Sequence, residues 1–524
     1  MGERTADGTA MNGAEALLRS LVGSGVDVCF ANPGTSELQF VAALDRVPAM
    51  RAVLTLFEGV ATGAADGYAR VARKPAATLL HLGPGLANGW ANLHNARRAR
   101  VPLVNVVGDH ATYHQRFDTP LQSDLWGLAR SASAWQRSST RPEDVGADAA
   151  EAVAASYGPP GGIATLVVPA DVSWGGGAAP ASPRPIPPVP LVPPETIESV
   201  ARVFGSGERV VLLIGGAALR EQGLEAAARI AHATGAKLLG ETFPAVHARG
   251  GGLPDVEKLA YYGETAMDQL SGARHLVVAG ARAPASFFAY PGKPSDLVPD
   301  GTTLHELAGP AHDVPAALDA LADTLGAHAP APRSAATRPP RPSGRITPES
   351  MAAAIGHTLP DGAIVVDESV TSGLSVPAAT AGGPRHDWLS LTGGSIGQGL
   401  PAATGAAVAA PGRRVVCLEA DGSAMYTIQA LWTQARESLD VTTVVLVNQA
   451  YAILQFELGR VGTSEDGDRA RAMLDLRHPS LDVVALARGM GVPAERARDA
   501  DDLVSLLERS FSANGPMLIE ARLT

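Results

Sequence analysis

Two polar side chains follow two apolar runs in the C-terminal third of the chain, where they could bind a metal ion that prefers oxygen ligands. Asp421 comes directly after RVVCLEA, and Asn448 comes directly after TTVVLV. Such runs indicate buried strands of a parallel sheet, whose carboxyl ends meet at one edge. Mg²⁺ binds carboxylate, amide and carbonyl oxygens together with phosphate oxygens. We therefore predict a Mg²⁺ site formed by Asp421, Asn448 and the carbonyl group of Ala450.

The residues after Asp421 also favour a diphosphate. Gly422 lets the backbone approach a ligand closely. A helix predicted to open at Ser423 and to continue through AMYTIQALWTQARES would offer free N–H groups to an anion. Taken singly, Asp421 could be a helix N-cap and Asn448 a turn residue. Their pairing at neighbouring strand ends favours the metal and diphosphate interpretation.

A further carboxylate, Glu58, stands in the first third of the chain. It follows the apolar run AVLTLF and starts a segment of small residues, GVATGAADGYARVA, that we expect to be helical. A glutamate at a helix start is also favoured simply by the helix dipole. His81 ends another apolar run, ATLLHL, and histidine suits proton transfer near neutral pH. A strand-end histidine with a purely structural partner is the alternative.

These segments together resemble thiamine-diphosphate-dependent enzymes of the acetolactate synthase and benzoylformate decarboxylase family. The family fingerprint is Gly-Asp-Gly followed later by Asn-Asn. Here EADGS carries Asp421, with Ala420 in place of the first Gly, and Asn448 is kept, with Val447 in place of the first Asn. The resemblance covers about 11–522 and is greatest to acetolactate synthase large-subunit-like proteins. It implies thiamine diphosphate and Mg²⁺ as cofactors.

The resemblance also assigns roles to residues. Glu58 matches the catalytic glutamate that contacts the pyrimidine ring of the cofactor. In the segment GGSIGQGLP, Ile396 matches the apolar residue that bends the cofactor. The loop NPGTSEL resembles the active-site loop of benzoylformate decarboxylase, with Thr35 at its serine position, and His81 matches a histidine there. The remaining residues predicted to contact the cofactor are Asn32, Pro33, Gly34, Gly394, Ser395, Gly422 and Ser423.

Two stretches rich in Pro, Gly and Ala divide the chain. They cover 175–194 and 328–344 and are typical of extended linkers. They predict three α/β domains, each with a parallel sheet, at 11–174, 195–327 and 345–524. The resemblance implies that these are, in order, a pyrimidine-binding domain, a central Rossmann-like domain, and a diphosphate- and Mg²⁺-binding domain. The apolar runs predicted as strands are 26–32, 52–57, 77–82, 102–108, 164–170, 210–216, 236–241, 275–280, 363–368, 414–420, 442–448 and 517–523.

Composition excludes several classes of protein. Hydrophobic residues make up 46% of the chain and charged residues 18%, which favours a folded protein over a disordered one. The net charge of −11, with no basic stripe, argues against a nucleic-acid partner. No apolar run is long enough to span a membrane. Cys29 and Cys417 lie in apolar segments and are expected to be buried thiols, which fits a cytoplasmic enzyme. Gly215-Gly216 alone is a weak nucleotide signal, so FAD is not predicted.

The resemblance implies decarboxylation of a small 2-oxo acid, followed by protonation or carboligation of the resulting enamine. At two positions where acetolactate synthases carry residues expected for their activity, this chain has different residues. These positions align with Pro120-Leu121 and with Glu457. A benzoylformate-type decarboxylase without carboligation is therefore one alternative, and a non-catalytic regulatory paralogue that binds the cofactor is another. The resemblance also implies a homodimer, or a tetramer of two such dimers, with active sites shared between subunits. The roles of His110 and His114 stay open.

Overall fold

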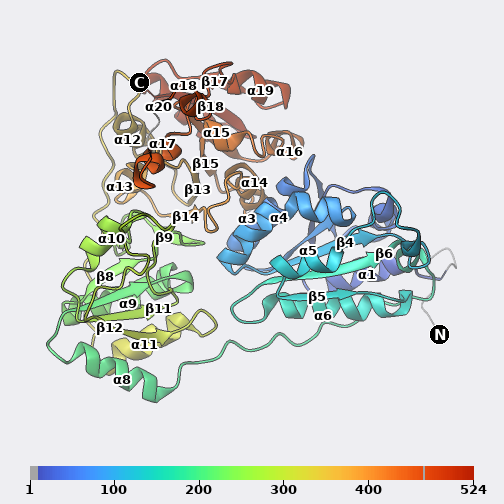
Figure 1. Ribbon diagram of the computed structural model, residues 1–524, viewed down its shortest axis with the longest axis horizontal. Helices are drawn as coiled ribbons and strands as arrows, with labels where there is room; N and C mark the ends of the chain where they lie inside the picture. Colours follow the sequence, from blue (N-terminus) through green and yellow to red (C-terminus); the bar gives the residue numbers. More distant parts are fainter. Residues whose placement is uncertain (1–9, 464–466, 524) are drawn as a thin grey trace.

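The computed structural model describes residues 10–463 and 467–523, which form three α/β units around three sheets (Figure 1). Residues 464–466 and 524, which belong to the third predicted domain range, lie outside the described residues. Every strand pair but one is parallel, as the apolar runs predicted, and the α/β fold class is confirmed. Cys29 and Cys417 are buried and unpaired. No helix among the described residues is long and apolar enough to cross a membrane.

The first unit has a six-stranded parallel sheet in the order β2-β1-β3-β4-β6-β5. Helices α1 and α6 pack against each other, and so do α3 and α4. The strands are β1 Val28–Ala31, β2 Arg51–Leu54, β3 Ala76–Leu80, β4 Leu103–Asp109, β5 Trp135–Ser138 and β6 Ile163–Pro169. The helices are α1 Gly13–Gly23, α2 Leu38–Ala43, α3 Glu58–Ala72, α4 Leu82–Ala99, α5 Leu125–Ala132, α6 Val145–Tyr157 and α7 Ala170–Trp174.

The second unit has a five-stranded parallel sheet in the order β10-β8-β7-β11-β12. Its central strands β7 and β11 are apolar and almost fully buried, as a sheet covered on both faces requires. The strands are β7 Val210–Ile214, β8 Lys237–Gly240, β10 Glu257–Lys258, β11 His275–Ala279 and β12 Thr303–Ala308. The helices are α8 Pro194–Phe204, α9 Glu221–Thr234, α10 Gly263–Leu270 and α11 Val314–Thr324.

The third unit has a seven-stranded sheet in the order β17-β18-β16-β15-β13-β14-β9. The edge strand β9 (His247–Arg249) comes from the middle of the chain and pairs antiparallel with β14. The other strands are β13 Ala363–Glu368, β14 His386–Ser390, β15 Val415–Ala420, β16 Val441–Val447, β17 Ala494–Arg496 and β18 Met517–Arg522. The helices are α12 Pro348–Thr358, α13 Val376–Thr380, α14 Gly399–Ala409, α15 Asp421–Ala424, α16 Ala430–Arg436, α17 Ala452–Arg460, α18 Asp468–Ala472, α19 Val483–Gly489 and α20 Ala500–Ser512.

Apart from Pro194, where α8 begins, the two Pro-rich stretches contain no helix, and their one β-type pairing is an isolated bridge at Gly176. Figure 1 shows the first as an extended trace that crosses from the first unit to α8. We propose that these stretches separate the three predicted domains. The pairing of β9 with β14 means that the range 195–327 also contributes one strand to the third sheet.

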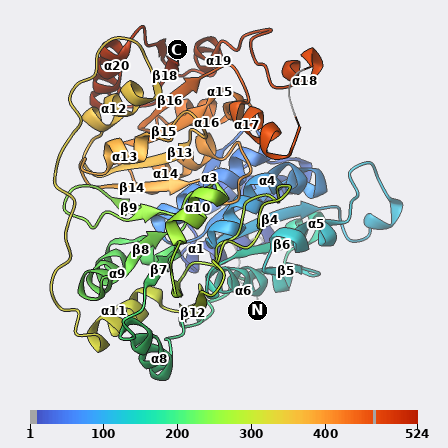
Figure 2. The same ribbon diagram turned by 60° about the vertical axis from the view of Figure 1, so that its left-hand side comes forward.

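Helices α3 and α14 join the first and third units closely (Figure 2). A Cβ atom added to Gly67 would overlap the carbonyl oxygen of Ala402, and one added to Gly405 would overlap that of Ala64. Only glycine permits so close an approach of two helix backbones. One hydrophobic core runs through both units, from Val28 in β1 to Leu518 in β18. Because Glu58 begins α3 and the glycine-rich segment precedes α14, this packing fixes the positions of these two predicted site regions relative to each other within one chain.

Candidate functional site

Asp421 lies where the chain leaves β15 and enters α15, and its side chain is almost fully buried. Its carboxylate accepts hydrogen bonds from the backbone N–H groups of Gln449, at 2.7 Å, and Gly422, at 3.0 Å. A Cβ atom at Gly422 would lie 2.6 Å from the ring of Tyr451, so any larger residue there would have to displace that ring. The bond to Gln449 joins the end of β15 to the end of β16, as predicted for neighbouring parallel strands.

Asn448 follows β16, and its side chain is fixed by two hydrogen bonds. Its Oδ1 atom accepts from the N–H of Ala450 at 3.0 Å, and its Nδ2 atom donates to Ser372 Oγ at 3.2 Å. Gln449, between the two, has a φ of 58°, in the left-handed region that non-glycine residues seldom occupy. This tight turn brings Asn448, Ala450 and Asp421 to one place.

The donor set at this place fits Mg²⁺. Burial raises the pKa of the Asp421 carboxyl group, and the N–H groups of Gln449 and Gly422 act in the opposite direction. A nearby cation would favour the ionised form further. The described residues contain no cluster of three or more His, Cys, Asp or Glu side chains that could hold a metal. A metal ion bound by one carboxylate, one amide and one carbonyl needs further oxygens, which a diphosphate supplies.

The predicted helix after Ser423 is interrupted. Helix α15 ends at Ala424, and α16 begins only at Ala430. Within the gap, Thr427 Oγ1 donates to the carbonyl of Gly397 at 3.0 Å, so this segment supports the glycine-rich segment instead of extending the helix. Ser423 Oγ donates to Glu419 Oε1 at 2.5 Å.

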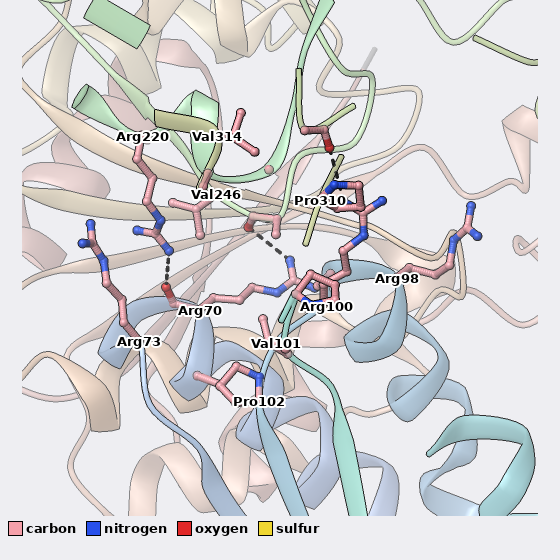
Figure 3. A pocket seen from close by; sticks show the side chains of 18 of the residues that line it. Arg70, Arg73, Arg98, Arg100, Val101, Pro102, Arg220, Val246, Pro310 and Val314 are labelled. Atoms are coloured by element: carbon pink, nitrogen blue, oxygen red, sulfur yellow. Dashed lines mark hydrogen bonds between the residues drawn. The ribbon is translucent and has the colours of Figure 1, made fainter. Parts of the chain in front are cut away.

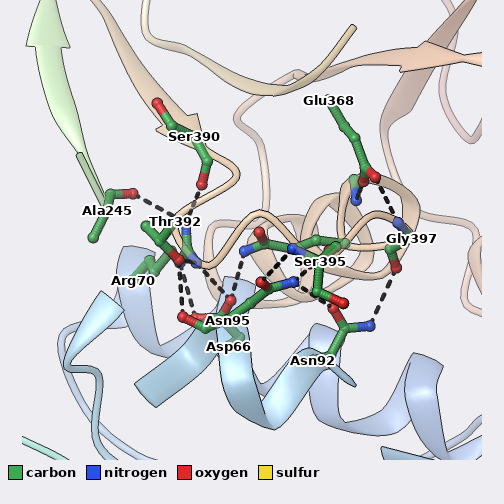
Figure 4. A network of polar contacts seen from close by, with 12 residues as sticks. Asp66, Arg70, Asn92, Asn95, Ala245, Glu368, Ser390, Thr392, Ser395 and Gly397 are labelled. Carbon is green, nitrogen blue, oxygen red and sulfur yellow. Dashed lines mark hydrogen bonds and ion pairs between the residues drawn. The ribbon is translucent and has the colours of Figure 1, made fainter. Parts of the chain in front are cut away.

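The glycine-rich segment 393–399 is held from two sides (Figure 4). The carboxylate of Glu368, at the end of β13, accepts from the N–H groups of Gly397, at 2.5 Å, and Gly399. From α4, the Asn95 side chain donates to the carbonyl of Ser395 at 2.7 Å and accepts from its N–H at 3.2 Å. Ile396 is only partly buried and belongs to none of the hydrophobic cores, so its side chain is available to a ligand.

Gly394 and Gly397 both have positive φ angles, of 73° and 93°. A Cβ atom at Gly394 would lie 2.5 Å from Phe287, and one at Gly397 would lie 2.6 Å from Tyr426. Both the backbone conformation and the lack of space therefore require glycine at these two positions. Burial raises the pKa of Glu368 to about 7, although the backbone N–H groups that it accepts from oppose the shift.

Glu58 begins α3 and is 7% exposed. Its Oε2 atom accepts a hydrogen bond from Asn88 Nδ2 at 3.0 Å. A Cβ atom at Gly85 would lie 3.2 Å from Oε1, so the absence of a side chain there leaves this oxygen uncrowded. The carboxylate is thus buried, with one side-chain donor, at the face of α3 that meets α4.

His81 lies between β3 and α4 and forms a hydrogen bond with Glu37. The distance from His81 Nδ1 to Glu37 Oε2 is 2.7 Å, and the same carboxylate oxygen accepts from the N–H of Gly34 at 2.8 Å. Burial raises the pKa of Glu37, and the His81 imidazole opposes that shift. The carboxylate orients the imidazole and leaves its Nε2 atom for another group. Thr35, in the same loop, is exposed.

The other histidines considered from the sequence lie in the loop after β4. His110 contacts Thr119 at 3.2 Å through Nε2, and its ring centroid lies 5.6 Å from that of His114. Asn32, which follows β1, donates its backbone N–H to the carbonyl of Leu79 at 3.3 Å. Pro33 continues the same partly buried loop.

A buried ion pair that the sequence did not suggest joins α3 to the glycine-rich segment (Figure 4). The guanidinium of Arg70 pairs with Asp66 at 2.7 Å, and neither side chain is exposed. Arg70 also donates to the carbonyl of Ser390 at 2.7 Å and to Thr392 Oγ1 at 2.9 Å, and Asp66 accepts from Gln398 at 2.7 Å. A buried pair of this kind needs all its partners, so it fixes α3 against this segment.

Models of known protein families match both ends of the chain. Residues 11–129 match the N-terminal TPP binding domain of thiamine pyrophosphate enzymes, and residues 373–521 match the C-terminal TPP binding domain. A Mycobacterium tuberculosis protein named "Putative acetolactate synthase large subunit IlvX" is 58% identical over 97% of this chain and 98% of its own length. The chain belongs to the thiamine pyrophosphate enzyme family. The predicted family is thereby confirmed, and the two matched regions contain every residue predicted to contact the cofactor.

Two decarboxylases are more distant relatives. Benzoylformate decarboxylase of Pseudomonas aeruginosa is 28% identical over 95% of this chain and 96% of its own length. The solved structure of a thiamine diphosphate-dependent 4-hydroxybenzoylformate decarboxylase from Rhodococcus jostii superposes with a TM-score of 0.86, at 26% identity, over 98% of this chain and 99% of that one. The three-unit fold of the described residues is therefore that of a thiamine-pyrophosphate-dependent enzyme.

Proposed function

We propose that this protein uses thiamine diphosphate and Mg²⁺ to decarboxylate a small 2-oxo acid, with the product then captured by a proton or by a second carbonyl compound. The observation that carries the proposal is the position of Glu58. A protein that only bound the cofactor would have no need of a buried carboxylate at the start of α3. Glu58 accepts a single side-chain hydrogen bond, and α3 is fixed against the glycine-rich segment.

Different residues around the site would bind different parts of the cofactor. Asp421, Asn448 and the carbonyl of Ala450 would hold Mg²⁺, with Gly422 and Ser423 beside the diphosphate. Gly394, Ser395 and Ile396 would contact the rings of the cofactor, together with Asn32, Pro33 and Gly34. When bound, thiamine diphosphate supplies a thiazolium carbon that becomes nucleophilic on losing its proton. Glu58 would exchange a proton with the pyrimidine nitrogen and so promote that loss.

His81 and Thr35 are proposed to act on the substrate. Because Glu37 holds Nδ1 of His81, its Nε2 can give a proton to, or take one from, a substrate atom in a fixed direction. The hydroxyl of Thr35 can donate a hydrogen bond to the substrate carboxylate. This pairing of His81 with Glu37 favours the second candidate, a benzoylformate-type decarboxylase that releases an aldehyde without carboligation.

Incubation of the purified protein with single 2-oxo acids tests the proposal. Pyruvate, 2-oxobutyrate and benzoylformate would each be supplied with cofactor and Mg²⁺, with and without a second carbonyl acceptor, and CO₂ and products would be followed. We expect CO₂ release from at least one acid and its loss in Asp421→Ala. Carboligated product would support the first candidate, and aldehyde alone the second. No CO₂ from any acid by protein that binds the cofactor would favour a non-catalytic role.

We further propose a cytoplasmic homodimer, alone or as half of a tetramer, in which Glu58 of one subunit serves the cofactor held by Asp421 of the other. The family resemblance supports this arrangement.

A further inference from the structure

Four lysines occur in the chain, and one of them has no ionic or hydrogen-bonded partner in the part that the structure describes. The other three each form an ion pair with a carboxylate: Lys74 with Asp27, Lys237 with Glu257 and Lys293 with Glu264. Among the described residues, the amino group of Lys258 forms neither an ion pair nor a hydrogen bond, and the side chain nearest to it is the ring of Phe243. Lys258 therefore offers an amino group that is free to react.

An aromatic wall leads from Lys258 toward the predicted cofactor site. Lys258 is exposed on β10, an edge strand of the second sheet, and its Nζ atom lies 6.0 Å from the ring centroid of Phe243. The ring of Phe243 meets that of Phe287 edge to face, with 5.8 Å between the centroids. Phe287 in turn abuts Gly394, where a Cβ atom would lie 2.5 Å from its ring. Two aromatic rings thus lie between the amine and the glycine-rich segment.

The place of this amine is distinct from the arginine-lined cleft between the first and second units (Figure 3). Phe243 borders that cleft, but Lys258 does not. In the cleft, Arg220 donates to the carbonyl of Arg70 at 2.9 Å. Guanidinium groups stay protonated in proteins, so they do not act as nucleophiles. Covalent chemistry with an electrophile therefore belongs to the primary amine of Lys258 and not to the cleft.

The surroundings of Lys258 favour the neutral form of its amine. Although the residue is exposed overall, protein surrounds the amino group closely enough for burial to lower its pKa, and Arg249 acts in the same direction while Asp367 opposes the shift. Asp367 forms no ion pair with Lys258 among the described residues, and it accepts instead from the N–H of Ser369 at 3.0 Å and from its hydroxyl at 2.5 Å. Burial lowers the pKa of His247 to about 3, so this neighbour is uncharged near neutral pH.

A neutral lysine amine beside an apolar ring is suited to covalent capture of carbonyl compounds. The nitrogen attacks the carbonyl carbon, the carbonyl oxygen leaves as water, and a C=N bond forms without any oxidation or reduction. We propose that Lys258 captures small apolar aldehydes in this way, as a reversible imine whose carbon part lies against Phe243. The proposed function would supply such aldehydes, but this amine stands outside the decarboxylation site and needs no turnover to react.

Reductive labelling with benzaldehyde and cyanoborohydride tests this proposal. The protein, saturated with thiamine diphosphate and Mg²⁺, would be labelled at pH 7, and peptide mass spectrometry would give the labelling rate of each lysine. We expect Lys258 to be labelled about tenfold faster than Lys74, Lys237 and Lys293, because a larger fraction of its amine is neutral at that pH. The advantage should shrink at pH 10, where the three paired lysines also lose protons. Lys258→Arg should lose the main label, and Lys293→Arg, the matched control, should keep it.

A second variant tests the part played by the ring. In Phe243→Leu, labelling of Lys258 by benzaldehyde should slow several-fold, whereas labelling by formaldehyde, which has no carbon part to bind, should stay the same. Equal slowing with both aldehydes would show that Phe243 acts on the amine or the fold and not on the ligand.

Three further outcomes would overturn the proposal. They are labelling of Lys258 no faster than that of Lys74 at pH 7, the same ratio of the two rates at pH 7 and pH 10, or faster labelling with pyruvate than with benzaldehyde. The last would assign the amine to 2-oxo acids. Because the assay measures labelling and not CO₂ release, its failure would leave the proposed decarboxylation untouched, and a failure of decarboxylation would not affect it.

Discussion

Asn92 and Gly397, 305 positions apart in the chain, are joined by a hydrogen bond of 3.1 Å from Nδ2 of the asparagine to the glycine carbonyl. The same Nδ2 donates to the carbonyl of Gly59 at 2.8 Å, directly after Glu58. One buried side chain thus links the start of α3 to the glycine-rich segment. The sequence suggested these two regions only separately, and the Asn92 side chain fixes their relative position.

Asn92→Ala should lower both stability and cofactor affinity. The substitution removes one hydrogen bond from each of two buried carbonyl groups, those of Gly59 and Gly397, at a cost of about 0.5–1.5 kcal/mol for each bond. The midpoint of thermal unfolding should fall, and the affinity for thiamine diphosphate should fall with it, since the glycine-rich segment loses a support. Ala91→Ser, at the exposed neighbouring position, is the control and should change neither quantity. Unaltered stability and affinity in Asn92→Ala would show that this bond is dispensable.

Cofactor binding should depend on the metal through Asp421. Removal of Mg²⁺ by a chelator should release thiamine diphosphate, and Asp421→Ala should bind none that calorimetry can detect. Asp468→Ala removes a carboxylate that is almost fully exposed in the same third of the chain, and should bind normally. Normal affinity in Asp421→Ala would mean that the diphosphate binds elsewhere.

A mixture of two inactive variants tests whether active sites are shared. Glu58→Gln and Asp421→Ala, each inactive alone, should recover part of the activity after subunit exchange. Half of the dimers would be hybrids with one intact site each, so about a quarter of wild-type turnover is expected. If verified hybrids stayed inactive, the site would belong to a single chain, in which α3 already packs on α14.

Glu368 should make the protein less stable as pH rises. Burial raises the pKa of Glu368 to about 7, above that of an unfolded glutamate, so between about pH 4.5 and 7 the folded state binds more protons. Stability from this group is present at the acidic end and is lost as pH rises through that window. Glu368→Gln cannot ionise, so its unfolding temperature should fall less than that of the wild type between pH 5 and 7. Parallel pH profiles would contradict this.

The parts of the fold that the sequence predicted are the buried ones. Each apolar run named from the sequence overlaps a strand of the structure, because strands covered on both faces have a continuous apolar signal. Strands β5, β9, β10, β12, β14 and β17 were missed. Segments such as WQRS and HAR are short, polar and near sheet edges, so no local pattern distinguishes them from loops. The pairing of β9 with β14 depends on contacts between distant segments.

In the candidate site, too, some residues could be predicted from the sequence and others could not. Asp421, Asn448 and Glu58 could be selected because each follows an apolar run, and His81 because it lies at the end of one; the resemblance gave them roles. The side chains that hold these residues and the glycine-rich segment in place could not be selected from the sequence. Asn95 meets Ser395 from 300 positions away, and only the folded chain shows that Glu37 faces His81. A helical asparagine or a buried glutamate has no sequence signal that identifies its partner.

The most direct test of the account is the rate at which the thiazolium proton of bound thiamine diphosphate exchanges into heavy water, measured by NMR. Exchange needs no substrate, so it isolates the role of Glu58. Glu58→Gln keeps size and hydrogen bonding but cannot cycle a proton. We predict near-normal cofactor affinity and an exchange rate lower by about 10²–10⁴-fold. Equal exchange rates in wild type and Glu58→Gln would contradict the account and favour a protein that only binds the cofactor.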